Sequence, residues 1–222
     1  MKVSINKNIK QLLPNCRLGY AVIDGTIVQG SPPNLSREFY ELQMAAAAAY
    51  KIELLPNIPR IAAVRAMFKK MDVDPSRYRP ASEALVRRVL NGKGLYYINS
   101  AVDVNNYCSL KFLLPFGLYS ADKIDGDVDY ALAENGSYVN IAGKTSCTGR
   151  KPFLGDRQGV FGNPTADAGR TAVTLQTKQL LSVIYADEEV SNQELEDILQ
   201  FTVQMLVRYN SGEVREQGII IA

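Results

Sequence analysis

RPASEALVRRVLNGKGLYYINSAVDVNNY, residues 79–107, contains two helical patterns joined by a short polar loop. In the first pattern, Leu85, Val89 and Leu90 lie at helical spacing and Asn91-Gly92 is a typical C-terminal cap, which predicts a helix over about 81–91. The second pattern predicts a helix over 100–112, capped by Asn99 or Ser100. Working outward, further helices are predicted over about 36–51, from Pro59 to Met71, and over 191–209, where Ser191 and Glu194 form a capping box.

The second half of the chain changes to short strand patterns separated by Gly, Asn and Asp turns. These patterns predict strands over 127–133, 137–141, 172–176 and 180–186. Asp24-Gly25, between two apolar runs, also predicts a strand pair within residues 15–30. Because there is no repeat and no linker, we expect one α+β domain over residues 1–222. Its helices would cover a mostly antiparallel or mixed sheet built mainly from residues 127–186.

Composition indicates the class of protein and the compartment in which it is expected. The 222 residues are 46% apolar and 22% charged, which is typical of a globular protein with a real core. The sequence has no apolar run of about 18 residues and no apolar segment of a signal peptide at its start, so we expect a soluble, cytoplasmic protein without a membrane segment. The three cysteines Cys16, Cys108 and Cys147 form no C-x-x-C pair and indicate reduced thiols.

The absence of histidine excludes several kinds of catalytic site. Ser-His-Asp and Cys-His systems need a histidine, and a structural zinc site without histidine needs four cysteines. A hard cation held by carboxylates stays open, although the sequence has no calcium-loop motif. We expect no metal and no cofactor. Chemistry would then depend on carboxylates, hydroxyls, amides, Lys, Arg, Tyr or backbone N–H groups.

A basic cluster lies between residues 69 and 93, interleaved with Tyr78, Tyr96 and Tyr97. Such clusters bind phosphate backbones, because each cation neutralises a phosphate and releases counterions. The candidate RNA-binding residues are Arg79, Arg87, Arg88 and Lys93. The alternative is an ordinary solvated helix face, with Glu83 and Arg87 forming an i,i+4 pair. The net charge of +2 implies no strong non-specific binding to nucleic acid.

Two further groups of polar residues are candidates for a ligand site. Asn105 and Asn106 are adjacent amides in a predicted helix, where asparagine is unfavourable, so they either bind something specific or cap neighbouring loops. The segment 162–171 is a glycine-flanked loop of the kind that surrounds a small polar ligand. Its alternative is a plain turn stabilised by an Asp167–Arg170 pair. The candidate loop residues are Asn163, Thr165, Asp167, Arg170 and Thr171.

Several of these stretches together resemble a known family. The run Arg79–Leu90, then Ile98-Asn99, the stretch Val102–Tyr107 and the stretch Asp122–Gly126 are similar, in order and spacing, to the B3/B4 domain of the phenylalanyl-tRNA synthetase β subunit. The resemblance covers roughly residues 60–186. Since the chain is far too short for a synthetase, it resembles the free-standing B3/B4-like proteins. In the bacterial synthetase, this domain hydrolyses tyrosine misattached to the phenylalanine tRNA, and the family is also described as RNA-binding.

The resemblance implies a site with substitutions. The family's Thr-Asn pair corresponds to Asn105 and Asn106, its histidine falls on Gly117, and the glutamate that reads the tyrosine hydroxyl falls near Asn163. We therefore expect that tyrosine specificity is not inherited. Gly117 should leave space where the family has histidine, with Asn106 and the 162–171 loop facing one cavity.

Two functions follow as hypotheses. One is a free-standing editing factor that hydrolyses misacylated or noncanonical aminoacyl-tRNA, with Asp167 and Asn106 as catalytic residues. Its substrate-binding residues would be Asn105, Asn163, Thr165, Arg170 and Thr171. The alternative is a non-catalytic module that binds RNA or an amino-acid-like small molecule. The expected partner is tRNA or aminoacyl-tRNA.

Overall fold

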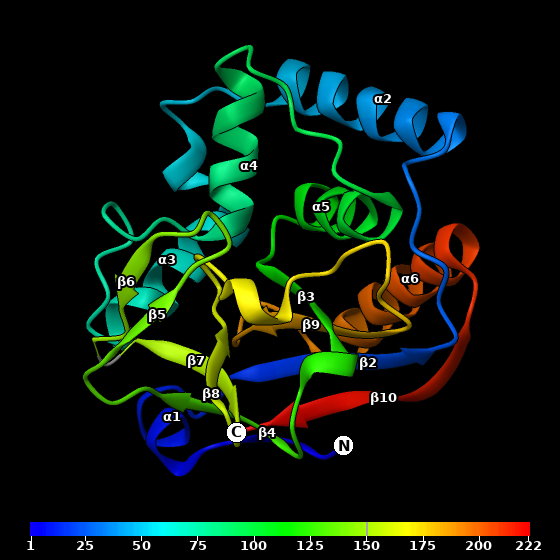
Figure 1. Ribbon diagram of the computed structural model, residues 1–222. Helices are drawn as coiled ribbons and strands as arrows, with labels where there is room; N and C mark the ends of the chain where they lie inside the picture. Colours follow the sequence, from blue (N-terminus) through cyan, green and yellow to red (C-terminus); the bar gives the residue numbers. More distant parts are fainter. Residues whose placement is uncertain (150) are drawn as a thin grey trace.

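The core of the molecule is built around strand β2 (Arg17–Asp24), in a four-stranded antiparallel sheet of order β10-β2-β9-β3. Its other strands are β3 (Phe116–Ser120), β9 (Gln179–Ala186) and β10 (Glu213–Ile221). β9 is apolar on both faces, since every residue from Leu180 to Ala186 except Ser182 is hydrophobic and all are buried. A strand that is buried on both sides must be covered on both sides. The computed structural model, which describes residues 1–149 and 151–222, shows what covers it (Figure 1).

A second four-stranded sheet covers one face. Its order is β1-β4-β7-β8, with β1 (Val3–Ile5) parallel to β4 (Val128–Leu132) and the remaining pairs antiparallel. β7 (Pro152–Asp156) and β8 (Gly159–Gly162) complete it. The two sheets meet through aromatic rings, with Tyr130 against Tyr185 at 5.4 Å and Tyr119 against Phe161 at 5.0 Å between centroids. A separate hairpin, β5 (Ser137–Val139) and β6 (Thr145–Cys147), packs Tyr138 on Phe153 of the second sheet.

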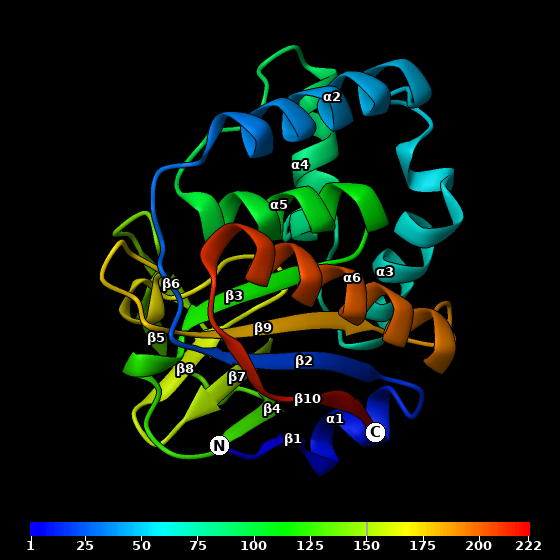
Figure 2. The ribbon, with the colours of Figure 1, turned by 90° about the vertical axis from the view of Figure 1, so that its right-hand side faces the viewer.

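Helices cover the other face in two layers (Figure 2). α5 (Ser100–Phe112) and α6 (Asn192–Asn210) lie nearest to the first sheet, while α2 (Pro33–Ala49) and α4 (Ala81–Leu90) lie outside α5. The remaining helices are α1 (Lys7–Leu12) and α3 (Pro59–Lys70), with 3-10 turns over Leu55–Asn57, Ala121–Lys123 and Gly169–Thr171. Side-chain caps start three of the described helices: Asn6 accepts from Asn8 N–H, Asn99 from Val102 N–H, and Ser191 from Glu194 N–H.

The α+β class and the five predicted helices are confirmed, and two strand predictions are wrong. Residues 27–30 form no strand, because Thr26 N–H donates to the Lys178 carbonyl and Ile27 N–H to the Asn210 carbonyl, which leads the chain away toward α2. Residues 172–176 form an irregular segment that ends in a turn, with Thr177 N–H donating to the Thr174 carbonyl. The expectation of one sheet from 127–186 is also wrong: the described residues form two four-stranded sheets and a hairpin, and β1, β2, β3 and β10 lie outside that range. Among the described helices, none has the length and apolar composition of a membrane span.

Candidate functional site

The 162–171 loop leaves β8 and turns Asp167 toward the interface between the two sheets. Asp167 Oδ1 accepts hydrogen bonds from the Tyr119 hydroxyl at 2.9 Å and from Asn163 N–H at 3.0 Å. The Tyr119 hydroxyl also lies 3.0 Å from that of Tyr185. Burial raises the pKa of Asp167 to about 6, although both of its hydrogen bonds act to lower it. This carboxyl group therefore titrates near neutral pH, as a general acid or base does.

Asn163 holds the loop to the second sheet. Its Nδ2 donates to the Pro152 carbonyl at 2.7 Å, and its Oδ1 accepts from Thr165 N–H at 2.8 Å and from the Thr165 hydroxyl. The amide is buried, its nitrogen donates and its oxygen accepts, and the bond from Thr165 N–H to that oxygen is the geometry of an Asx turn. A substrate-binding role for Asn163 and Thr165 stays a prediction, and it would require exchange of these bonds for bonds to a ligand.

Arg170 pairs with Asp156 and not with Asp167, which corrects the pair considered for this loop. Its Nη2 lies 2.6 Å from Asp156 Oδ1 and 2.7 Å from the Gly159 carbonyl. Burial alone would raise the pKa of Asp156, but the bonds from Arg170 and two backbone N–H groups lower it overall. Arg170 thus closes the free edge of β8. Thr171 is fully buried, and its hydroxyl has no partner within the described residues.

The asparagine pair lies on α5 and takes no part in this hydrogen-bond network. Asn105 and Asn106 are half-buried, and Asn105 Oδ1 is shielded from solvent without a hydrogen-bond partner among the described residues. Within residues 1–149 and 151–222, no hydrogen bond joins either asparagine to the 162–171 loop. The structure therefore brings Asp167, Asn163 and Thr165 together, while the shared cavity with Asn106 stays a prediction.

The expected space beside Gly117 is filled. A Cβ built on Gly117 would overlap the Tyr119 hydroxyl, and one built on Gly162 would also lie within 2.6 Å of the Tyr119 ring. Tyr119 therefore occupies the volume next to Gly117, and the expectation of an open space there is wrong. Only glycine fits at these two positions, because the Tyr119 hydroxyl and ring occupy the space that a Cβ would need.

The basic cluster surrounds a buried carboxylate. Glu83 has 0% of its surface exposed and accepts from Arg65 Nη1 at 2.9 Å and Arg87 Nε at 2.7 Å, with Arg79 Nε at 3.7 Å. Three guanidinium groups share one negative charge, so two positive charges remain uncompensated within the cluster. The cluster lies beside the 162–171 loop, because Ala81 N–H at the start of α4 donates to the Pro164 carbonyl.

The other two predicted RNA-binding residues lie farther along the chain. The Arg88 guanidinium lies 3.9 Å from the centroid of the Tyr96 ring, and 67% of Tyr96 is exposed. Lys93 is exposed in the loop that follows α4. Arg88 and Tyr96 form a stacked cation and aromatic pair, an arrangement that nucleobases can extend.

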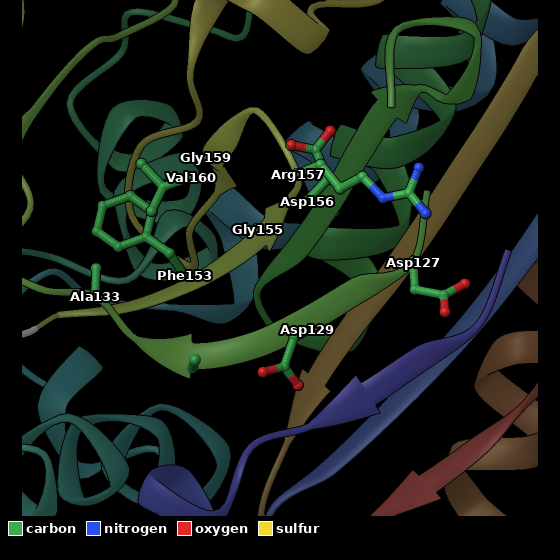
Figure 3. Close-up of a pocket in the computed structure, with 10 residues that line it drawn as sticks. Asp127, Asp129, Ala133, Phe153, Gly155, Asp156, Arg157, Gly159 and Val160 are labelled. Carbon is green, nitrogen blue, oxygen red and sulfur yellow. The ribbon is translucent and has the colours of Figure 1, made fainter. Parts of the chain in front are cut away.

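A hollow of about 450 Å³ lies on the outer face of the second sheet. Register contributes to it: Asp129 lies opposite Gly155 and Ala131 opposite Phe153, so each large lining side chain faces a small residue across the strand pair. Charged groups lie at one end and apolar groups at the other, as Figure 3 shows for Asp127 and Arg157 against Phe153, Val160 and Ala133. None of the predicted site residues lines this hollow.

Sequence reasoning missed Tyr119, Tyr185, Arg65 and Asp156. Arg65 and Asp156 pair with residues 18 and 14 positions away, beyond the reach of a helical or strand spacing, whereas Glu83 had a local signal, since it lies four residues from both Arg79 and Arg87. Tyr119 lies two residues after Gly117, where the side chain returns to the same face of the strand. In the described part of the chain, no three His, Cys, Asp or Glu side chains are placed to hold a metal ion.

The family model of the B3/4 domain matches residues 63–210, which include both the arginine cluster around Glu83 and the 162–171 loop. The chain belongs to the B3/4 domain family. Among solved structures, it is similar to an N-terminal fragment of the phenylalanyl-tRNA synthetase β subunit from Pyrococcus horikoshii, with 12% identity and a TM-score of 0.45. That similarity covers 99% of this chain and 50% of the other, so the chain spans half the length of the synthetase fragment. No curated protein sequence matches the chain.

The B3/4 match confirms the resemblance predicted from residues 79–126, and it extends beyond residue 186 into α6. The hydrogen-bonded Asp167 group and the Glu83 arginine cluster both lie within it. Together with the hollow on the second sheet, they are the features from which a function is argued below.

Proposed function

We propose that this B3/4 protein binds RNA, with tRNA as its partner, through the guanidinium groups around Glu83. The observation that carries the proposal is the excess of two positive charges in the Arg65, Arg79 and Arg87 cluster. Glu83 fixes one side of each guanidinium group, which leaves other N–H donors for phosphate oxygens. Arg88 on Tyr96 offers a stacking surface for an unpaired base next to these phosphates.

The salt dependence of binding to labelled tRNA tests this proposal. The double variant Arg79→Ala/Arg87→Ala should bind more weakly, and its slope of log affinity against log salt should fall by about two. Arg65 Nη1 still donates to both Glu83 carboxylate oxygens in this variant, so folding should survive. Lys7→Ala/Lys10→Ala removes the same charge from exposed positions on α1 and serves as the control. An equal slope in wild type and the arginine variant would contradict the proposal.

Hydrolysis of an aminoacyl ester is the catalytic form of the same proposal. Asp167 Oδ2 accepts no hydrogen bond from the described residues, so this oxygen is available to orient a water molecule. Binding is better supported than hydrolysis, because Tyr119 fills the volume beside Gly117 and holds Oδ1. A panel of aminoacyl-tRNAs separates the two: a responsive substrate should be hydrolysed about 10²-fold more slowly by Asp167→Asn. If the wild type hydrolyses no substrate of the panel, the hydrolysis proposal is contradicted and only the RNA-binding proposal remains.

A small-molecule function is favoured by the hollow on the outer face of the second sheet. Its charged end offers Asp127 and Arg157 to the two ends of an amino-acid-like zwitterion, and its apolar end offers Phe153 and Val160 to a side chain. Gly155 has ordinary backbone angles, and a Cβ there would meet its nearest atom at 3.5 Å, so Gly155→Val should fill the floor and abolish binding without unfolding. Calorimetric titration with apolar amino acids measures this. Equal affinity in the variant would exclude the hollow.

A further inference from the structure

Strand β10 lies at the edge of the first sheet and, within the described residues, is hydrogen-bonded to β2 alone. Ala222 N–H donates to the Cys16 carbonyl, which makes these two residues a hydrogen-bonded pair of the β10–β2 ladder. Such pairs alternate along an antiparallel ladder. The backbone N–H and C=O groups of Gln217, Ile219 and Ile221 therefore point away from β2, to the outer edge of β10.

The second half of β10 is an unprotected edge. Edge strands are usually kept from pairing by charged residues, prolines or bulges, and the first half of β10 has charged residues and a bulge between Val214 and Glu216. From Gln217 to Ile221 the strand has no charge, no proline and no bulge. β1, which approaches β10 from the second sheet, is hydrogen-bonded to β4 and, in the described chain, not to β10. This half of β10 can therefore accept a further strand.

A groove of about 440 Å³ lies between this edge and α6. Gly19 of β2 shows which face of the sheet borders the groove, because a Cβ built there would meet Leu195 of α6 at 3.3 Å. Ile219 is the register partner of Gly19, so the side chains of Ile219 and Gln217 also point toward α6. A strand added antiparallel to β10 would project every second side chain into this groove.

Charge in the groove selects a basic partner. Its α6 wall carries Glu196, Asp197 and two glutamines, and none of its lining residues is Lys or Arg. Glu196 and Asp197 are exposed, and the ion pairs of α6 within residues 1–149 and 151–222 involve Glu194 and Arg208 instead. Side chains that enter the groove from an added strand would meet uncompensated negative charge, which favours Lys and Arg.

The same charge disfavours a second copy of this chain. Two β10 edges would pair antiparallel about a two-fold axis perpendicular to the sheet, with both α6 helices on one face and on either side of the seam. Glu196 and Asp197 of each copy would then face those of the other copy across a shared groove, where like charges repel. A partner with cations at alternate positions replaces this repulsion with attraction.

We propose that the outer edge of β10 binds an extended segment of a partner protein in which every second residue is Lys or Arg. The segment adds antiparallel to β10, as all pairs of this sheet are, and exchanges backbone hydrogen bonds with its three outward-pointing residues. Its cations then lie against Glu196 and Asp197. The site shares no residue with the arginine cluster around Glu83, so it is independent of the RNA-binding proposal.

Fluorescence anisotropy of a labelled peptide of alternating lysine and threonine, titrated with the full chain, tests this proposal. Backbone N-methylation of the lysines should abolish binding, because in an antiparallel pair the residues that face α6 turn their N–H groups toward β10. N-methylation of the threonines should leave binding unchanged, because their N–H groups point away. The two methylated peptides carry the same charge, so the comparison separates strand addition from charge attraction alone.

Charge reversal on α6 is the second test. Glu196→Lys/Asp197→Lys should weaken binding of the lysine peptide about tenfold or more and should instead bind a peptide of alternating glutamate and threonine. Glu53→Lys/Glu134→Lys makes the same change of charge at exposed positions outside the groove and should bind like the wild type. Circular dichroism verifies that both variants are folded.

Three results would overturn the inference. One is a wild-type chain that does not bind the lysine peptide, and another is an equal effect of the two methylation patterns or of the two charge variants. The third is self-association of the free chain in sedimentation equilibrium that Ile219→Pro abolishes, since this substitution removes an outward N–H group of β10. That result would assign the edge to a second copy.

Discussion

Gly117 and Gly162 approach the Tyr119 ring from two strands, and this crowding makes Gly117 the most sensitive single position near Asp167. Gly117→Ala would push the Tyr119 ring away and break its bond to Asp167, so we expect a loss of about 1–3 kcal/mol in unfolding free energy. Urea denaturation measures this. Gly155→Ala is the matched control, because its new methyl group would meet only ordinary contacts and should change stability little.

A double variant tests the cause of that loss. In a Tyr119→Leu background the hydroxyl and the far edge of the ring are gone, so Gly117→Ala should cost much less. Equal costs in the two backgrounds would show that Tyr119 does not limit the space beside Gly117.

At the scale of elements, α4 depends on its charge cluster. Glu83→Ala would leave three guanidinium groups without their shared carboxylate, and we expect a loss of about 3 kcal/mol. Added inorganic sulfate should recover part of this loss, because an anion can replace the carboxylate between the guanidinium groups. Thermal unfolding with sulfate and with chloride at equal ionic strength measures the recovery. If the two salts stabilise the variant equally, the cluster has no anion site.

The elements also show what the sequence could predict. Helices α2 to α6 were predictable because the spacing of their apolar residues and their caps are local signals. β1 pairs with β4 and β2 with β9 and β10, across more than a hundred residues, and no local pattern encodes such partners. Likewise, the identities of Asn163 and Asp167 were evident, but Tyr119 as the partner of Asp167 depends on how the two sheets pack.

At the scale of the whole molecule, the ionisation of Asp167 couples pH to the packing of one sheet on the other. Burial raises the pKa of Asp167 in the folded protein to about 6, from an ordinary value near 3.8. The folded state therefore binds this proton more tightly than the unfolded chain does. Below about pH 4 the group is protonated in both states and does not change the free energy of unfolding. As pH rises to about 6, deprotonation of the unfolded chain progressively lowers that free energy. The shift corresponds to at most about 3 kcal/mol.

We therefore expect the contribution of Asp167 to the free energy of unfolding to fall between pH 4 and pH 7. Asp156 has the opposite trend, because Arg170 lowers its pKa. Urea midpoints of wild type and Asp167→Asn across this range isolate the effect, since only the wild type carries the titrating group. The difference between the two curves should change steadily from about pH 4 and level off above about pH 6. Tyr119→Phe removes a hydrogen bond that lowers the Asp167 pKa, so its transition should move to higher pH. Parallel curves for wild type and Asp167→Asn would show that Asp167 keeps an ordinary pKa. That result would contradict the role of Asp167 as a carboxyl group that exchanges protons near neutral pH.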